Sequence, residues 1–137
     1  MNTKYYVFVY GSLKKGYENS HYLTNSKFIG NAISANPEFQ MYSVHEGYPA
    51  LTKGDEFVKG EIYEINDEKL KDLDRLEGYP NYYNRDVFQF FCDGKRINAF
   101  VYYFKNERDY SSWIDFYLKK ESPRISRHLN TAEWLKR

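Results

Sequence analysis

The feature that most constrains the fold is an unbroken apolar and aromatic run near the N-terminus, Tyr5-Tyr6-Val7-Phe8-Val9-Tyr10. The run has the length and the residue types of a β-strand, and it lacks the polar alternation of a strand with one solvated face. It therefore predicts a strand that is buried on both faces and central in its sheet. Gly11-Ser12 breaks the run and Gly16 follows, which predicts a compact loop at the end of a rigid strand.

Five later segments have strand composition and are separated by turn residues. They are residues 28–33, 39–42, 58–65, 87–91 and 97–104. A hairpin is expected to join the last two, because Asp93-Gly94 between them is typical of a tight turn. Many strands and few helices predict a β-rich α+β fold, in which a mixed sheet curls into a small barrel with a few short helices and so avoids exposed edges.

The sequence predicts a helix between Asn66 and Gly78. Asn66 is a favourable N-cap, the first turn is acidic as the helix dipole favours, and Gly78 is suited to end the helix. A second helix is predicted over residues 110–120, where aromatic residues fall on one helical side. One further helical turn is expected over residues 131–135.

Composition narrows the class of protein. A chain of 137 residues, without repeats or a Pro/Gly/Ser linker, predicts a single domain over residues 1–137. A hydrophobic fraction of 42% with 20% aromatic residues favours a packed core over disorder. The net charge of +1 provides no long-range field for nucleic acid or an acidic membrane, so we expect neither partner and a small-molecule substrate instead.

The expected location is the cytoplasm. Cys92 is the only cysteine, so the chain forms no intramolecular disulfide and suits a reducing compartment. The apolar run at residues 5–10 is too short for a signal-peptide core or a membrane span.

One carboxylate falls on the apolar side of the first predicted helix. At about 100° per residue, three leucines form one stripe: Leu70, Leu73 and Leu76. Glu77 projects within that stripe, where burial and the negative end of the helix dipole both raise the pKa of a carboxyl group. Such a group suits general acid/base catalysis. Helix geometry alone leaves open that Glu77 turns to solvent or pairs with Arg75 or Arg85.

Asp74 lies one helical turn before Glu77. It is either a solvated surface acid or a neighbour that raises the Glu77 pKa by repulsion between like charges.

The loop after the first strand is a second candidate site. A turn at Gly11-Ser12 can direct consecutive backbone N–H groups into one cavity, and Gly11 would allow a ligand to approach closely. Fixed N–H donors suit a carboxylate or a developing oxyanion. A Gly-Ser pair after a strand is equally consistent with an ordinary turn. The motif around a nucleophilic serine is absent, so the Ser12 hydroxyl is expected to support the loop.

Other chemistries lack their sequence patterns. Lys14-Lys15 is not part of a complete phosphate-binding loop motif. The three histidines, His21, His45 and His128, do not have the spacing of a zinc site, so no metal is expected. Cys92 lies in a predicted turn without a neighbouring histidine and is not a candidate nucleophile.

Together, several segments resemble the gamma-glutamylcyclotransferase-like family, which includes gamma-glutamylamine cyclotransferases and avirulence-induced plant proteins. In chain order they are residues 7–16 with Tyr10-Gly11-Ser12-Leu13, residues 47–51 with Tyr48-Pro49-Ala50, residues 58–65, Leu73-Asp74-Arg75-Leu76-Glu77-Gly78, Tyr83-Asn84-Arg85, and residues 99–103. The resemblance covers about residues 5–104, and the segment beyond residue 104 is less typical of the family.

The resemblance implies a barrel with a cavity between Glu77 and the loop of residues 11–16, here called the glycine loop. It also implies an amide-cleaving, cyclising acyltransferase without a metal or organic cofactor. In this chemistry the α-amino group of a γ-glutamyl compound attacks its own γ-carbonyl and releases 5-oxoproline and an amine or amino acid. Glu77 would be the acid/base, the backbone of Gly11, Ser12 and Leu13 would bind substrate, and Tyr10 and Tyr83 would line the pocket.

The sequence is also consistent with two other functions. One is a non-catalytic protein that binds a small γ-glutamyl or amino-acid-like ligand. The other is an enzyme that removes a γ-glutamyl group from a biosynthetic intermediate by the same chemistry, with a different leaving group.

Overall fold

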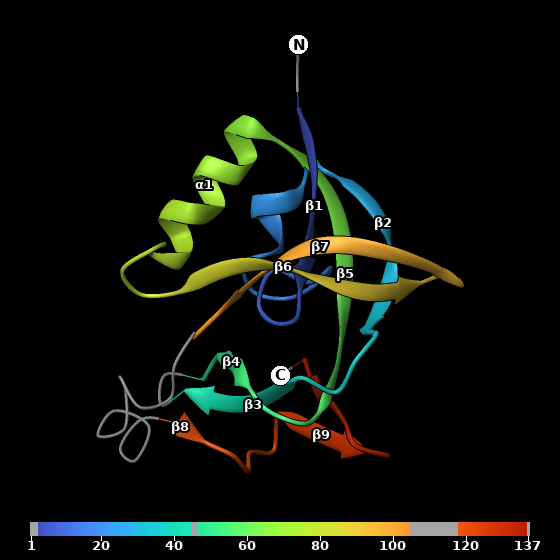
Figure 1. Ribbon diagram of the computed structural model, residues 1–137. Coiled ribbons are helices and arrows are strands. Elements are labelled where there is room, and N and C mark those ends of the chain that lie inside the picture. The colour runs from blue at the N-terminus through green and yellow to red at the C-terminus, as the bar shows by residue number, and fades with distance from the viewer. Residues whose placement is uncertain (1–2, 45–46, 105–117, 137) are drawn as a thin grey trace.

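Five strands close a mixed β-barrel in the computed structural model, which describes residues 3–44, 47–104 and 118–136 (Figure 1). In spatial order they are β1 (Lys4–Val9), β7 (Lys95–Tyr103), β6 (Asn84–Cys92), β2 (Lys27–Ser34) and β5 (Phe57–Asn66), and β5 pairs back onto β1. Within this ring β1 and β7 are parallel, whereas the other four pairs are antiparallel. The predicted α+β, barrel-like fold is confirmed.

The remaining strands gather at the end of the barrel away from the N-terminus (Figure 1). A second sheet has the order β4 (Pro49–Lys53), β3 (Phe39–Val44) and β8 (Leu118–Lys119). The hairpin of β9 (Ile125–His128) and β10 (Thr131–Trp134) extends the barrel sheet, because β10 pairs in parallel with β5. A short 3₁₀ helix, η1 (Ser20–Leu23), follows the glycine loop.

Strand β1 lies between β5 and β7, as its apolar run predicts, but it is buried only over its second half. Phe8 belongs to the barrel interior, with Ile62 and Phe90. Val7 and Val9 face the opposite side and pack in a second apolar cluster that includes buried residues of the helix. Lys4 and Tyr6 are exposed, so the prediction of burial on both faces is wrong for the first half of the strand.

Helix α1 (Asp67–Glu77) begins and ends as predicted. The Asn66 side chain accepts a hydrogen bond of 2.8 Å from the Lys69 N–H, which satisfies one of the open donors of the first turn. Gly78 has a φ of 66° and closes the last turn in the left-handed conformation that glycine favours. Leu73 is fully buried, but Leu76 is 38% exposed and does not continue the buried stripe.

The β6–β7 hairpin is confirmed, with positive φ at both Asp93 and Gly94, as a type I′ turn requires. The helical turn expected over residues 131–135 is wrong, because that segment pairs with β5 and β9 as strand β10. Leu118–Lys119, the end of the helix predicted over residues 110–120, is strand β8 instead. Residues 110–117 of that predicted helix lie outside the described residues.

Candidate active site

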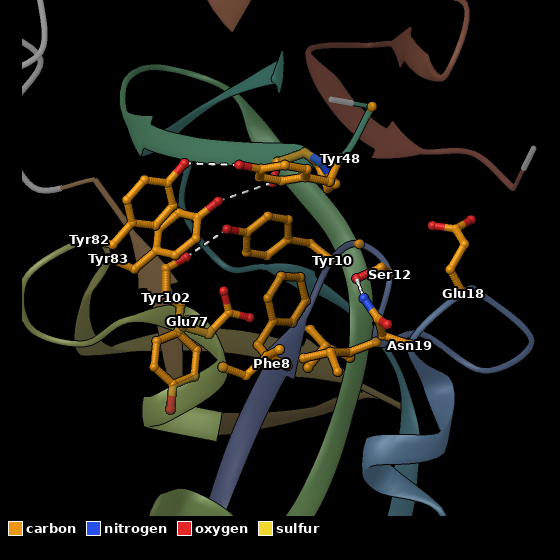
Figure 2. A pocket seen from close by; sticks show the side chains of 16 residues that line it. Phe8, Tyr10, Ser12, Glu18, Asn19, Tyr48, Glu77, Tyr82, Tyr83 and Tyr102 are labelled. Carbon is orange, nitrogen blue, oxygen red and sulfur yellow. Dashed lines mark hydrogen bonds between the residues drawn. The ribbon is translucent and has the colours of Figure 1, made fainter. Parts of the chain in front are cut away.

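A cavity of about 340 Å³ opens where β1 ends and α1 terminates (Figure 2). All six site residues that the sequence singled out line this cavity: Tyr10, Gly11, Ser12, Leu13, Glu77 and Tyr83. The end of β1 supplies the glycine loop, α1 supplies the carboxylate, and the connection from α1 to β6 supplies Tyr83. The structure thus brings the two candidate sites together, although they are more than sixty residues apart in the sequence.

Glu77 ends α1 and directs its carboxylate into the cavity, beside Phe8 and below Tyr10 (Figure 2). Within the described residues, no side chain forms a hydrogen bond or an ion pair with this carboxylate. Burial disfavours the charged form and raises the Glu77 pKa from 4.5 to about 7. A carboxyl group that ionises near neutrality can both accept and donate a proton at physiological pH.

The two arginines that could have neutralised Glu77 are bound elsewhere. Arg85 pairs with Asp74, and Arg75 pairs with Asp72 on the exposed face of the helix. Asp74 is therefore neither a solvated acid nor an unpaired charge. Burial is what raises the Glu77 pKa, so the repulsion from Asp74 that the sequence allowed is not its cause.

Tyrosines form much of the cavity wall. The Tyr10 hydroxyl donates to the Tyr102 carbonyl at 2.7 Å, and the Tyr48 and Tyr82 hydroxyls share a hydrogen bond of 2.9 Å across the cavity (Figure 2). Burial raises the pKa values of Tyr10 and Tyr83 well above the usual range, and the nearby Glu77 carboxylate adds to this. Both phenols therefore stay protonated and neutral around pH 7.

The glycine loop is held by its own carbonyl groups. The Gly11 carbonyl accepts from the Lys14 N–H at 3.0 Å, and the Ser12 carbonyl accepts from the Asn19 N–H at 2.8 Å. In both bonds the loop residue is the acceptor, so they do not use the N–H groups of Gly11 and Ser12. The Asn19 side chain also donates to the Ser12 hydroxyl at 2.9 Å, which agrees with a supporting role for that hydroxyl.

The structure gives a different reason for glycine at position 11. A Cβ atom on Gly11 would overlap the ring of Pro49, which starts β4 and also lines the cavity. The space beside the Gly11 Cα is therefore occupied by protein. Glycine is needed here for the packing of β4 against the loop, rather than for direct approach of a ligand as the sequence suggested.

Sequence reasoning missed several cavity residues: Glu18, Asn19, Tyr48 and Tyr82. Tyr48 lay in a segment that carried the family resemblance, which was the available signal for it. The others come from connections whose path depends on the packing of the whole barrel.

Within the described residues, no group of three or more His, Cys, Asp or Glu side chains is placed to hold a metal ion. The expectation of a site without a metal stays a prediction. No helix in the described ranges is long and apolar enough to cross a membrane.

Small barrel proteins of known structure share this fold. A mouse protein described as AIG2-like superposes with a TM-score of 0.68 at 29% identity, over 73% of this chain and 76% of that one. A chain titled gamma-glutamyl cyclotransferase shares the fold with a TM-score of 0.60 at 18% identity.

The family itself follows from the sequence match. The family described as "Gamma-glutamyl cyclotransferase, AIG2-like" matches residues 7–134, so the chain belongs to it. Two curated relatives carry the name "Putative gamma-glutamylcyclotransferase". The one from Methanocaldococcus jannaschii is 42% identical over 72% of this chain and 83% of its own. The one from Vibrio cholerae is 30% identical over 96% of both chains.

Proposed function

We propose that this protein is a gamma-glutamyl cyclotransferase that releases 5-oxoproline and an amine or amino acid from a γ-glutamyl substrate. The observation that carries the proposal is the Glu77 carboxyl group, which faces the cavity without a partner among the described residues and has a pKa of about 7. A surface carboxylate ionises much lower and would be fully charged at neutral pH.

The proposed reaction is an intramolecular aminolysis. The α-amino nitrogen attacks the γ-carbonyl carbon, Glu77 accepts the proton that this nitrogen loses, and a five-membered ring forms. The bond from the γ-carbon to the leaving nitrogen then breaks as Glu77 returns the proton to that nitrogen. One carboxyl group suffices for both transfers because its pKa lies close to the working pH.

The cavity wall supports this chemistry with neutral groups. Backbone N–H groups of Gly11, Ser12 and Leu13 are assigned to the α-carboxylate or to the oxyanion, where fixed donors are most effective. Tyr10 and Tyr83 enclose the reacting atoms and stay protonated. We also place the reaction in the cytoplasm, because the one cysteine, Cys92, is a free thiol that suits a reducing compartment.

Substitution of Glu77 by Gln tests the assignment. Gln is nearly isosteric and cannot carry a proton between the two nitrogens, so turnover should fall by a factor on the order of 10²–10⁴ while ligand binding persists. Purified protein is screened against γ-glutamyl-lysine, γ-glutamyl-alanine, glutathione and simple γ-glutamyl amines, with detection of 5-oxoproline. Glu68→Gln, an exposed change on the same helix, is the matched control and should leave turnover unchanged.

The other outcomes distinguish the remaining functions. Substrates with a blocked α-amino group should not react, and hydrolysis of one of them would show that water is the nucleophile. Normal 5-oxoproline formation by folded Glu77→Gln protein would refute the mechanism. Tight binding without turnover of any compound would favour a binding protein, although a buried carboxylate is a costly feature in a pocket for an acidic ligand.

A further inference from the structure

Asp74, in the last turn of α1 together with Glu77, forms a partly buried ion pair with Arg85 of β6. The Arg85 Nε and Asp74 Oδ1 atoms are 2.7 Å apart, and a second hydrogen bond joins the other Arg85 nitrogen to Asp74 Oδ2 at 3.1 Å. The two side chains are only 20% and 21% exposed. Another ion pair of the same helix, Arg75 with Asp72, has exposures of 77% and 46%. The two pairs therefore differ in burial and in which face of the helix they occupy.

The buried pair is connected to the cavity wall. The Tyr102 hydroxyl donates to Asp74 Oδ1 at 2.6 Å, and the Tyr102 carbonyl accepts from the Tyr10 hydroxyl at 2.7 Å. Both tyrosines line the cavity. Asp74 thus links α1 to β7 and, through β7, to the residue that precedes the glycine loop.

Arg85 is itself fixed by aromatic rings. Its guanidinium carbon lies 4.4 Å from the Tyr79 ring centroid and 5.0 Å from that of Phe100. Tyr79 follows the end of α1, and its N–H donates to the Asp74 carbonyl at 2.9 Å. The side chain that neutralises Asp74 therefore also packs against the end of the helix, where Glu77 lies.

Among the described residues, the other groups that line the cavity around Glu77 are neutral or paired. Tyr10, Tyr83 and Tyr102 surround it with phenols whose pKa values are raised by burial, so they remain uncharged. Glu18 lines the far side of the cavity and is paired with Arg124. Asp74 and Arg85 form the charged pair that is joined to this cavity wall through the Tyr102 hydroxyl.

We propose that Asp74 and Arg85 act together as a positioning pair for Glu77, holding the last turn of α1 against β6 and β7 while cancelling each other's charge. The proposal rests on the acid/base role of Glu77 proposed above. The pair touches neither substrate nor the reacting atoms in this scheme. It acts through the orientation of Glu77 and through the electrostatic potential at its carboxylate.

The two partners have opposite effects on Glu77 when they are removed singly. Arg85→Gln leaves an unbalanced negative charge on Asp74, which should raise the Glu77 pKa by roughly half a unit or more. Asp74→Asn leaves an unbalanced positive charge on Arg85, which should lower it by a similar amount. The double variant has no unbalanced charge and should titrate close to the wild-type protein. A purely structural role would not produce shifts of opposite sign.

Two readouts test the proposal. The Glu77 titration is followed directly by NMR of ¹³C-labelled glutamate carboxyl groups, with the Glu77 resonance identified by its absence in Glu77→Gln. The second readout is the acid limb of the pH profile of kcat/KM, which should move up in Arg85→Gln and down in Asp74→Asn. Both variants should also lose at least tenfold in kcat, because the last turn of α1 is less firmly held. Arg85→Lys keeps the charge but not the double hydrogen bond, so it should lower kcat without moving the titration.

The exposed pair supplies the controls, since Asp72→Asn and Arg75→Gln change charge on the same helix away from the cavity and should move neither readout. Shifts of the same sign in both buried variants, or equal shifts in the controls, would overturn the proposal. Asp74→Asn is nearly isosteric and decides the matter alone if Arg85→Gln does not fold, because an unmoved Glu77 titration in it also overturns the proposal. The NMR titration needs no turnover, so it separates failure of this proposal from failure of the proposed function.

Discussion

The Glu77 carboxylate lies in the cavity without a partner among the described residues, and this links its chemistry to the stability of the protein. Its pKa of about 7 in the folded state exceeds the ordinary value of 4.5, so the folded state binds the proton more tightly than the unfolded state. As the pH rises from 4.5 through 7, the carboxyl group ionises at a cost that the unfolded chain does not bear. The free energy of unfolding therefore contains a penalty that is absent at low pH and complete above pH 7.

Glu77→Gln should remove this penalty. We expect the variant to exceed the wild-type protein in stability by up to about 3 kcal/mol at pH 8, since one pKa unit corresponds to about 1.4 kcal/mol. The difference should vanish well below pH 4.5, at about pH 3, where Glu77 is protonated in both states. Urea unfolding of both proteins across this range measures it. A difference that is the same at every pH would contradict the assigned pKa.

The two residues of the glycine loop should respond differently to substitution. Ser12→Ala removes one hydrogen bond from Asn19 and should keep turnover within about tenfold of wild type, because a neutral hydrogen bond contributes about 1 kcal/mol. Gly11→Val should abolish turnover, because the new side chain overlaps the Pro49 ring and displaces the start of β4. Steady-state 5-oxoproline assays, with melting temperatures as the check on folding, compare the two.

A Ser12→Ala protein as inactive as Glu77→Gln would return a serine nucleophile to consideration. Mass spectrometry of the enzyme during turnover would then be expected to find a covalent acyl-enzyme.

At the scale of single elements, the sequence predicted structure well where local signals determine it. It failed where an element depends on pairing with a strand far away in the sequence. The bounds of α1 followed from an N-cap and a C-terminal glycine, both of which act within one turn of the helix. Residues 131–135 were predicted as helical, yet they form β10 because β5 and β9 offer backbone partners. Strand β4 was not among the predicted strands, since pairing with β3 fixes its extended conformation. The sequence located six of the cavity residues but could not show that Pro49 fills the space beside Gly11.

The N-cap of α1 can be tested separately from the cavity. Asn66→Ala removes the acceptor for the Lys69 N–H at the end of the helix remote from Glu77 and should cost about 1 kcal/mol of stability. Asn66→Asp retains a good acceptor and should cost much less. Because Glu77 is held by the opposite end of α1, kcat should change little in either variant. Chemical denaturation and activity assays on the same preparations check both statements.

At the scale of the whole molecule, an ion pair ties the C-terminal hairpin to the strands it covers. The Arg127 Nε atom lies 2.6 Å from Glu56 Oε2, and a second Arg127 nitrogen donates to the Met41 carbonyl at 2.6 Å. The Glu56 side chain is only 9% exposed. Such a carboxylate depends on its cation, because a buried charge without a partner is strongly unfavourable.

Arg127→Met should therefore lower the free energy of unfolding by about 3 kcal/mol, whereas the double variant with Glu56→Gln should lose less, because no unpaired charge remains. Arg75→Met removes the exposed pair with Asp72 and serves as the control, with an expected loss under about 1 kcal/mol. Urea denaturation at neutral pH compares the three proteins. Equal losses in the single and double variants would show that the ion pair is not the stabilising contact.

The way the barrel closes also sets the order in which its parts become available during translation. Strand β1 is the first barrel strand to leave the ribosome, whereas β5 and β7, its two neighbours, are synthesised later. At about 5–20 residues per second, the nascent chain carries the segment Tyr5–Tyr10 for several seconds before a partner exists. That segment is rich in aromatic and β-branched residues and is uncharged, which makes it prone to pair with other unfinished chains. Lys4 at its start is the kind of charged flanking residue that opposes such pairing. The same strand that supports the cavity is thus the segment of the newly made chain with the greatest need of protection until β5 is synthesised.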